Sequence, residues 1–491
     1  MPKLIVIGAG VAGIATAIRA AVQGYDVTVF EQNSYPGGKL AEIRENGFRF
    51  DAGPSLFTMP QYVDELFLLA GKNPRDYFTC SKLDLVCNYF YEDGTSISAW
   101  ADADRFAREV AAHTADNAVA VKKFLAKSGE IYGITSPVFL ERSLHKVRSY
   151  LNLQTLRSLL RLPAIDPFRT MNEANSRRFR DAKTIQLFNR YATYNGSDPY
   201  QAPATLNVIP HLEHHFGAWF PQGGMYNITR ALVRLAEELQ VTFEYNAPVQ
   251  EIMLSSRKVT GITSRGQFHP ADAVVSNMDV YFTYTRLLKK IRPPKHILRQ
   301  ERSSSALIFY WGISGAVGES LDLHNIFFSE DYAAEFNAIW KAQRIYEDPT
   351  VYVNISAKLE AADAPPGCEN WFVMINVPAD SGQDWEQLTN EARKHVLTKL
   401  SRNLGKDVAS AIVSESVLGP RGIGKNTSSY RGSIYGTSSN SKYAAFLRHA
   451  NRSATVHGLY FAGGSVHPGG GIPLALLSAK IVAGMLRQVK R

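Results

Sequence analysis

The chain has 491 residues, of which 45% are hydrophobic and 20% charged, the balance of an ordinary globular protein with room for two or three domains. Its three cysteines, Cys80, Cys87 and Cys368, make neither a disulfide framework nor a zinc-binding spacing. We therefore expect a reducing compartment and no metal site. We expect neither a signal peptide nor a membrane-spanning helix, because the chain opens directly into LIVIGAG and no apolar run approaches roughly 18 residues.

The net charge is +9, and much of the excess lies between Arg142 and Arg190, where eleven Lys or Arg residues face three acidic ones. Three interpretations of this basic segment stay open: a solvated helical face, attraction to an anionic membrane surface, or nucleic-acid binding. The last is the least favoured, because no recognised nucleic-acid-binding module accompanies the charge.

The first predicted elements are a strand and a helix joined by a glycine-rich turn. Leu4–Ile7 is an apolar run typical of a parallel strand buried on both faces. Gly8, Gly10 and Gly13 follow in GxGxxG spacing. In that motif the first glycine makes the tight turn, the second lets the backbone approach a pyrophosphate, and the third allows close helix packing. Ala12 is one of several small residues that let this helix lie near the sheet.

An acidic residue ends the second predicted strand, DVTVF. Glu31 stands where a carboxylate binds a ribose 2′-hydroxyl in dinucleotide-binding folds. An empty strand-to-helix turn would not explain this acid. Because a carboxylate also disfavours a 2′-phosphate, the arrangement predicts a dinucleotide site and argues against NADP.

A second pair of glycines favours FAD over NAD. In EQNSYPGGKL, Gly37 and Gly38 precede Lys39, and the stretch resembles the double-glycine flavoprotein pattern, in which the pyrophosphate is wrapped from its other side. Arg is the more usual residue after these glycines. Lys39 supplies positive charge, but its ammonium cannot make the paired hydrogen bonds to a phosphate that a guanidinium makes. In the resembling families the next loop, FRFDAGPSLF, runs close under the flavin ring, which assigns Gly53, Pro54 and Ser55 to the site. For Gly53 and Pro54, an ordinary turn is the alternative.

Two further segments are predicted to return to this domain. The stretch PQGGMYNITRALVRLAEELQVTFEYNAPVQEI, from Pro221, predicts a glycine turn, an amphipathic helix and two short strands. In double-glycine flavoproteins the strand carrying Val249 lies beside the adenine, although a core valine is the alternative. Ala271–Asp279 predicts the next strand of the same domain, whereas the apolar run from Ala306 predicts a buried strand elsewhere.

The final predicted elements are a strand, a glycine cluster and a helix, in GLYFAGGSVHPGGGIPLALLSAK. Gly463 and Gly464 end the strand, Gly471 belongs to the glycine turn, and the helix begins near Ile472 and Pro473, since proline is favoured in a first helical turn. The N-terminus of this helix is predicted to point at the pyrimidine end of the flavin, where its dipole and free N–H groups stabilise negative charge. Many double-glycine enzymes carry an acid at the position of Gly464, and this chain does not.

Each of these motifs is shared by many flavoproteins, but the whole set in this order is typical of far fewer. VIGAGVAG, PGGKL, FDAGPSLF, WFPQGGM, SNMD, YRGSIYG and FAGGSVHPGGGIP together resemble the bacterial carotenoid desaturases of the phytoene-desaturase type. GPSLFTMPQYVDELFLLAGKNPRDYF and IYEDPTVYVNISAKLEAADAPPGCENWF are similar to the branch that acts as 1-hydroxycarotenoid 3,4-desaturase.

This resemblance implies an α/β fold with a discontinuous, Rossmann-like FAD-binding domain of the double-glycine type. The domain is predicted to comprise residues 1–75, 221–290 and 450–491. Residues 76–220 and 291–449 are predicted to form an inserted α+β substrate domain with a helical, membrane-facing part. The polar stretch KNTSSYRGSIYGTSSNSK, from Lys425, is expected to form a surface or lid loop.

The expected activity is FAD-dependent desaturation of a long polyene at a membrane surface on the cytoplasmic side, by hydride transfer to the flavin. Oxygen or a quinone would accept the electrons. His467 and Arg142, the latter with Glu141, are candidate catalytic groups; packing under a turn and a surface ion pair are their alternatives. Phytoene or lycopene desaturation, amine oxidation, and flavin-less binding of prenylated lipids are the alternative functions.

Overall fold

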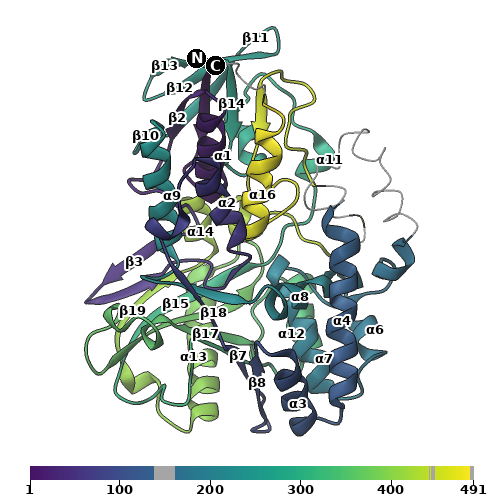
Figure 1. The fold of residues 1–491 in the computed structure, drawn as a ribbon. Helices are drawn as coiled ribbons and strands as arrows, with labels where there is room; N and C mark the ends of the chain where they lie inside the picture. The colour runs from purple at the N-terminus through teal and green to yellow at the C-terminus, as the bar shows by residue number, and fades with distance from the viewer. Residues whose placement is uncertain (138–160, 442, 444–447, 487–491) are drawn as a thin grey trace.

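The computed structural model describes residues 1–137, 161–441, 443 and 448–486. Figure 1 shows two regions, one around a small sheet near both ends of the described chain and one around a larger sheet flanked by helices. Arg142 and its neighbour Glu141 lie outside the described residues, as does the rest of the basic segment up to residue 160. No helix in the described ranges is both long and apolar enough to cross a membrane.

The first region is built on a parallel sheet of order β10-β2-β1-β14-β20. The five strands pair in parallel and come from three separate stretches of chain, as a discontinuous domain requires. The predicted α/β architecture is confirmed; the exact domain boundaries stay predictions. The strands are β1 (Lys3–Ile7), β2 (Asp26–Phe30), β10 (Thr242–Glu244), β14 (Ala273–Ser276) and β20 (Leu459–Phe461).

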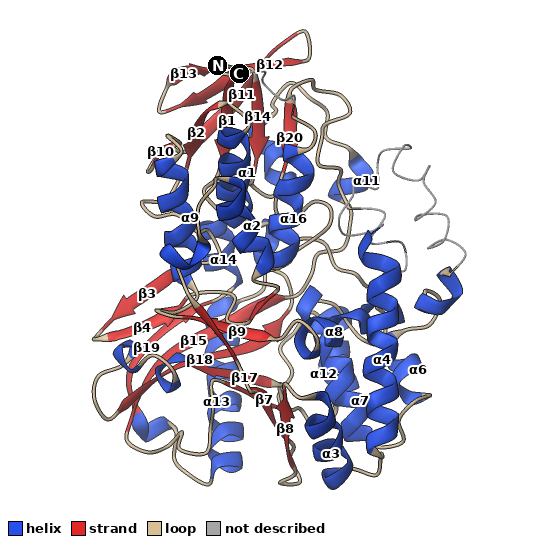
Figure 2. Ribbon diagram, viewed as in Figure 1, coloured by secondary structure: helices blue, strands red, loops and turns tan. Residues whose placement is uncertain are grey.

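Helices cover this sheet because their small and apolar residues share one core with it. α1 (Val11–Val22) packs against α9 (Tyr226–Glu238) and α16 (Ile472–Ala483), with α2 (Gln61–Leu69) beside them (Figure 2). An antiparallel sheet of β11 (Val249–Ser255), β12 (Lys258–Ser264) and β13 (Gln267–Pro270) extends the region. A second antiparallel pair, β3 (Glu42–Glu45) with β4 (Phe48–Asp51), packs instead on the larger sheet of the second region.

The second region is built on a seven-stranded sheet whose two faces have different roles. Leu307, Phe309 and Trp311 of β15 pack toward α13 (Trp385–Leu404) in one core, so the alternating residues Ala306, Ile308 and Tyr310 point to the opposite face. The predicted buried strand from Ala306 is therefore confirmed. The order is β19 (Ile412–Leu418), β15 (Ser305–Ser314), β18 (Cys368–Val377), β17 (Val351–Ile355), β16 (His324–Phe327), β7 (Leu85–Phe90) and β8 (Ser96–Trp100).

Helices stand beside this sheet at the lower right of Figure 2. They share a core of aromatic residues with β7 and β8. The helices are α3 (Ala103–His113), α4 (Ala118–Thr135), α6 (Met171–Ser176), α7 (Ala182–Asn189), α8 (Ile209–His214) and α12 (Tyr332–Asn337). A small sheet of β5 (Phe57–Thr58), β9 (Ala218–Pro221) and β6 (Cys80–Lys82) connects the regions. The short helices α10 (Val280–Phe282), α11 (Lys295–Leu298) and α14 (Pro420–Thr427) complete the α-helices of the described residues.

The expectation of a surface or lid loop from Lys425 is wrong for most of the segment. Its first residues belong to α14, and Ser433 and Thr437 are buried. The backbone of the segment is paired with hydroxyls from the start of β15: Ser305 Oγ donates to the Gly432 carbonyl over 2.6 Å, and the backbone N–H of Tyr435 donates to Ser303 Oγ over 3.0 Å. This polar stretch is therefore a buried, hydrogen-bonded segment and not a solvent-exposed loop.

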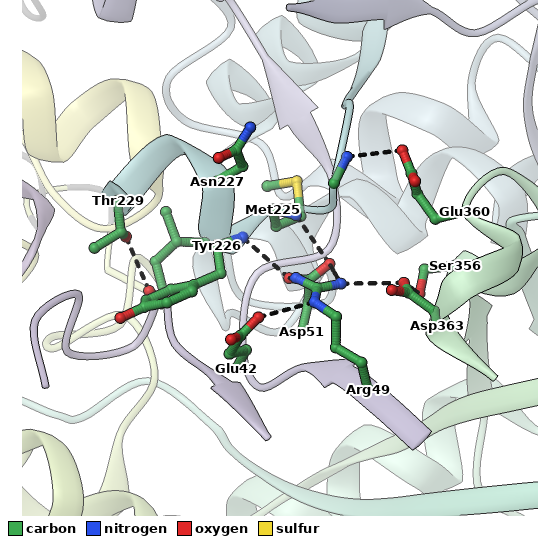
Figure 3. A network of polar contacts seen from close by, with 12 residues as sticks. Glu42, Arg49, Asp51, Met225, Tyr226, Asn227, Thr229, Ser356, Glu360 and Asp363 are labelled. Atoms are coloured by element: carbon green, nitrogen blue, oxygen red, sulfur yellow. Dashed lines mark hydrogen bonds and ion pairs between the residues drawn. The ribbon is translucent and has the colours of Figure 1, made fainter. Parts of the chain in front are cut away.

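A buried ion-pair network joins the two regions (Figure 3). The Arg49 guanidinium lies 2.9 Å from Glu42, 2.6 Å from Asp51 and 3.0 Å from Asp363. Burial opposes the charge of Arg49, but the two aspartates outweigh it and raise the pKa of the guanidinium. Asp51 also accepts hydrogen bonds from the backbone N–H groups of Met225 and Tyr226 at the start of α9. The network therefore fixes the loop that begins at Ala52.

Replacing Arg49 by leucine tests this network. Arg49→Leu leaves Asp51 and Asp363 buried without their cation, so we expect the free energy of unfolding to fall by about 3 kcal/mol or more. Arg44 is the matched control, because it contacts the same Glu42 but its side chain is 62% exposed. Arg44→Leu is expected to change stability by ~0.5 kcal/mol or less. Urea unfolding of the flavin-loaded proteins measures both; equal losses would contradict the role given to Arg49.

Candidate functional site

Asn277, directly after β14, lies between two glycine-rich loops. A Cβ atom on Gly10 would lie 2.6 Å from Asn277 Oδ1, and one on Gly463 would lie 2.6 Å from Asn277 Nδ2. A Cβ on Gly13 would lie 2.1 Å from the Gly8 carbonyl oxygen. Asn277 in turn donates from Nδ2 to the Ala462 carbonyl over 2.9 Å. Glycine is therefore required at these positions because the backbone of both loops approaches one side chain.

Glu31 closes the first loop from the end of β2. Its carboxylate accepts hydrogen bonds from the backbone N–H of Ala9 over 2.7 Å and of Asn33 over 2.9 Å. Burial raises the pKa of Glu31, while these hydrogen bonds favour the charged form. The side chain lines a cavity and retains oxygen lone pairs for a ribose hydroxyl.

The double-glycine segment lies against the first loop. The backbone N–H of Gly37 donates to the Ala9 carbonyl over 2.8 Å, and a Cβ on Gly38 would lie 3.4 Å from the Gly10 Cα. Lys39 follows, and its Nζ donates to the Ile434 carbonyl over 2.7 Å. Loss of solvent around the ammonium lowers the pKa of Lys39 to about 8, with Asp279 opposing the shift.

The third part of the site is the start of α16. Gly471 precedes the helix with φ of 97°, and Pro473 lies in its first turn. The helix thus begins where the sequence predicts it. Gly464 packs closely on the returning chain, since a Cβ there would lie 3.3 Å from the Gly470 Cα. The free N–H groups of the first helical turn follow directly after this glycine loop.

The predicted cofactor residues, with the exception of Gly13, line one cavity of about 1010 Å³. The cavity is as large as the largest usual ligand pockets. Gly13 instead packs behind the loop, against Gly8. The residues fit a dinucleotide: the glycine backbones leave a cradle that side chains would fill, Glu31 can take a ribose, and Lys39 supplies positive charge. The lining set is Gly8, Gly10, Ala12, Glu31, Gly37, Gly38, Lys39, Gly53, Pro54, Ser55, Val249, Gly463, Gly464, Gly471 and Ile472.

Beyond the glycine loops the cavity is walled by the seven-stranded sheet. The face opposite α13 contributes Ile308, Tyr310, Tyr352, Phe372 and Met374 to the lining. These residues alternate along β15, β17 and β18 with those that pack toward the core. The same cavity therefore holds a glycine cradle in one part and an apolar wall that excludes water in another.

His467 is buried beneath the last glycine loop and is not among the described residues that line the cavity. Its backbone N–H donates to the His449 carbonyl, and its carbonyl accepts from Asn451 Nδ2 over 2.7 Å. This placement favours packing under the turn. The catalytic roles predicted for His467 and for Arg142 stay predictions.

Sequence reasoning missed several polar residues of the site. Arg448 lines the cavity near Gly464, donates to the Thr437 carbonyl over 3.1 Å, and has its pKa lowered to about 10 by burial. Asn277 was visible only as part of SNMD, and Arg448 stands in no motif. Arg190, Glu213 and His324, which belong to the predicted substrate domain, also line the cavity. They come from distant parts of the chain, so no local pattern could have connected them.

A parallel sheet with a glycine-rich βαβ turn and a double-glycine segment, attached to a second region on a seven-stranded sheet, defines the fold of a flavin-dependent oxidoreductase. The sequence model of the flavin-containing amine oxidoreductases matches residues 11–486, and the chain belongs to this family. It is an oxidoreductase, and the expected cofactor, FAD, is confirmed. Amine oxidation is not implied by the family name alone, since its members include carotenoid desaturases.

Full-length relatives place the chain among the carotenoid desaturases, as the sequence motifs predict. A 1-hydroxycarotenoid 3,4-desaturase of Flavobacterium sp. (strain P99-3) is 51% identical over 486 residues, covering 99% of both chains. A 4,4′-diapolycopene oxygenase of Methylomonas sp. is 35% identical and covers 98% of this chain and 97% of its own. Among solved structures, an oxidoreductase from Methanosarcina mazei shares the fold with a TM-score of 0.65 at 16% identity, covering 98% of this chain and 100% of its own.

Lys39 makes cofactor binding dependent on pH. With a pKa of about 8, the lysine of the flavin-free protein is charged below pH 8 and neutral above it. A bound pyrophosphate would favour the charged form, so binding takes up a proton above pH 8. We therefore expect FAD affinity to fall about tenfold per pH unit above 8, measured by fluorescence titration of flavin-free protein between pH 7 and 9.5.

Two substitutions control this experiment. Lys39→Arg keeps its charge throughout the range and should make the affinity nearly independent of pH. Lys39→Met should bind FAD weakly at every pH. An affinity that falls equally in the wild type and in Lys39→Arg would show that another group titrates.

Proposed function

We propose that this protein is an FAD-dependent carotenoid desaturase that forms the 3,4 double bond of a 1-hydroxycarotenoid. The observation that carries the proposal is the single cavity in which a glycine cradle for FAD continues into an apolar wall. The 51% identity over 99% of both chains to a protein named for this reaction supports the substrate class. The glycine cradle disfavours a flavin-less lipid-binding protein.

Bound in the cradle, FAD would supply the two-electron oxidation of adjacent C–H groups. The protein's own residues hold and orient the reactants. Ile308, Met374 and Phe372 present a water-excluding surface to a polyene. The Tyr310 hydroxyl donates to the Ala52 carbonyl over 2.8 Å and so ties this surface to the Gly53–Ser55 loop. This hydrogen bond between Tyr310 and Ala52 holds the apolar wall at a fixed position relative to the glycine cradle.

We also propose that the protein docks on a membrane surface, where a carotenoid dissolves. Ile165 and Pro167 line the cavity, and the adjacent Phe168 is 83% exposed. Arg161 and Arg169 flank this segment with side chains that are 59% and 42% exposed. Exposed aromatic and basic residues beside a cavity lining are suited to an anionic lipid surface. Oxygen or a quinone as electron acceptor stays a prediction.

The proposed reaction is tested by expressing the chain in two hosts, one that makes a 1-hydroxylated carotenoid and one that makes phytoene or lycopene. Chromatography of the extracts should show a red-shifted product only in the first host. The Lys39→Met protein serves as a control with weakened cofactor binding. A coloured product from phytoene, with none from the hydroxylated carotenoid, would replace the proposal by phytoene desaturation.

A further inference from the structure

One part of the cavity lining is polar and buried, although it lies in the substrate region. We call it the polar pole and define it as Ser55, Arg190, Glu213, His324 and Tyr352, all of which line the cavity. Arg190, Glu213 and His324 are 5%, 1% and 4% exposed. Polar groups are costly to bury and need partners, so a polar pole at an apolar wall calls for an explanation.

Most of these groups satisfy one another. The Arg190 Nη2 donates to the Tyr89 hydroxyl over 2.6 Å and lies 3.7 Å from a Glu213 oxygen. Glu213 accepts a hydrogen bond from the Tyr191 hydroxyl over 2.6 Å, and the Tyr194 hydroxyl donates to its other oxygen. Protein groups therefore pair both oxygens of Glu213 and one end of the Arg190 guanidinium.

Two nitrogens of the pole are exceptions among the described residues, Arg190 Nε and His324 Nε2. The Nδ1 of His324 lies 2.7 Å from the Tyr352 hydroxyl and 3.2 Å from Asn354 Nδ2. An amide nitrogen only donates, so Nδ1 accepts and the proton of the neutral ring sits on Nε2. Burial and the charge of Arg190 lower the pKa of His324 to about 3, which keeps the ring neutral. Nε2–H has no hydrogen-bond partner among the described residues.

The pole also lies beside the loop assigned to the flavin. The Ser55 hydroxyl is 2.6 Å from the Tyr352 hydroxyl, so a hydrogen-bonded chain runs from Ser55 through Tyr352 to His324. In a 1-hydroxycarotenoid, the oxygen on C1 is only three bonds from C3, one of the two carbons that are oxidised. A group that binds this hydroxyl must therefore stand next to the reacting bond and not at the membrane end of the cavity.

We propose that the polar pole binds the tertiary hydroxyl of the substrate, with His324 Nε2–H donating to the hydroxyl oxygen. The inference rests on the proposed function and deepens it, because it assigns the residue that distinguishes a hydroxylated end from a hydrocarbon end. A carotenoid end without the hydroxyl would leave the buried N–H of His324 without a hydrogen-bond partner. Sites built to pair a substrate hydroxyl reject the analogue that lacks it for this reason.

The test compares a 1-hydroxylated carotenoid with the analogue that has hydrogen in place of the hydroxyl. His324→Phe keeps a ring and removes the N–H, and we expect its preference for the hydroxylated substrate, as a ratio of kcat/KM, to fall about tenfold or more. His324→Gln can again present an N–H and should recover part of the preference. His211→Phe is the matched control, because His211 packs against Tyr132 and Phe216 and is not in the described lining.

A second measurement separates binding from turnover. With the flavin chemically reduced under anaerobic conditions, carotenoid affinity is read from the shift of its absorption band. His324→Phe should weaken binding of the hydroxylated compound only, with flavin content equal to that of the wild type. If His324→Phe loads no flavin, Tyr352→Phe carries the test, because it removes the hydroxyl that holds the imidazole.

The outcomes distinguish the two proposals. An unchanged preference in His324→Phe, or in Tyr352→Phe where that variant carries the test, while the wild type converts the hydroxylated carotenoid, would overturn the role of the pole and leave the reaction in place. A wild type that converts only unhydroxylated carotenoids would overturn the proposed function, and the hydroxyl-binding role with it.

Discussion

The structure depends on how closely two glycine-rich loops approach the Asn277 side chain. Asn277 follows β14, which lies between β1 and β20 in the sheet, and the loops after β1 and β20 meet on either side of it. Any side chain at Gly10 or Gly463 would displace the asparagine or the loop. Since both loops line the same cavity, this contact places the start of α1 and the start of α16 around one ligand. It also explains why a strand-like run ends in so many glycines near residue 463.

A second constraint connects this cradle to the substrate region. The Arg49 network and the Tyr310 contact with Ala52 both hold the loop of Gly53, Pro54 and Ser55 between the two sheets. One face of the seven-stranded sheet packs on α13 while the other lines the cavity. Oxidation of an apolar molecule requires this combination, because the reacting carbons must meet the cofactor in the absence of water.

Much of the cofactor half could be predicted from the sequence, because its requirements are local. GxGxxG, the double glycine and GGGIP each require backbone conformations that favour glycine or proline, so these motifs predict the local structure. Helix α16 begins where the last motif predicts it. The polar pole could not be predicted, since Ser55, Arg190 and His324 are brought together only by the sheet and the helices. The interpretation of the segment from Lys425 was wrong because its buried backbone pairs with Ser303 and Ser305, which lie more than 100 residues away, and no local pattern shows such a partner.

The most direct measurement is a crystal structure of the FAD-loaded protein with a 1-hydroxylated carotenoid, grown anaerobically with the flavin reduced. Density for the flavin ring should lie beside the Gly53–Ser55 loop, with the polyene along Ile308 and Met374 and its hydroxyl within hydrogen-bond distance of His324 Nε2. A carotenoid bound with its hydroxyl toward Phe168, or a flavin outside the glycine cradle, would contradict the shared cavity on which the proposed reaction rests.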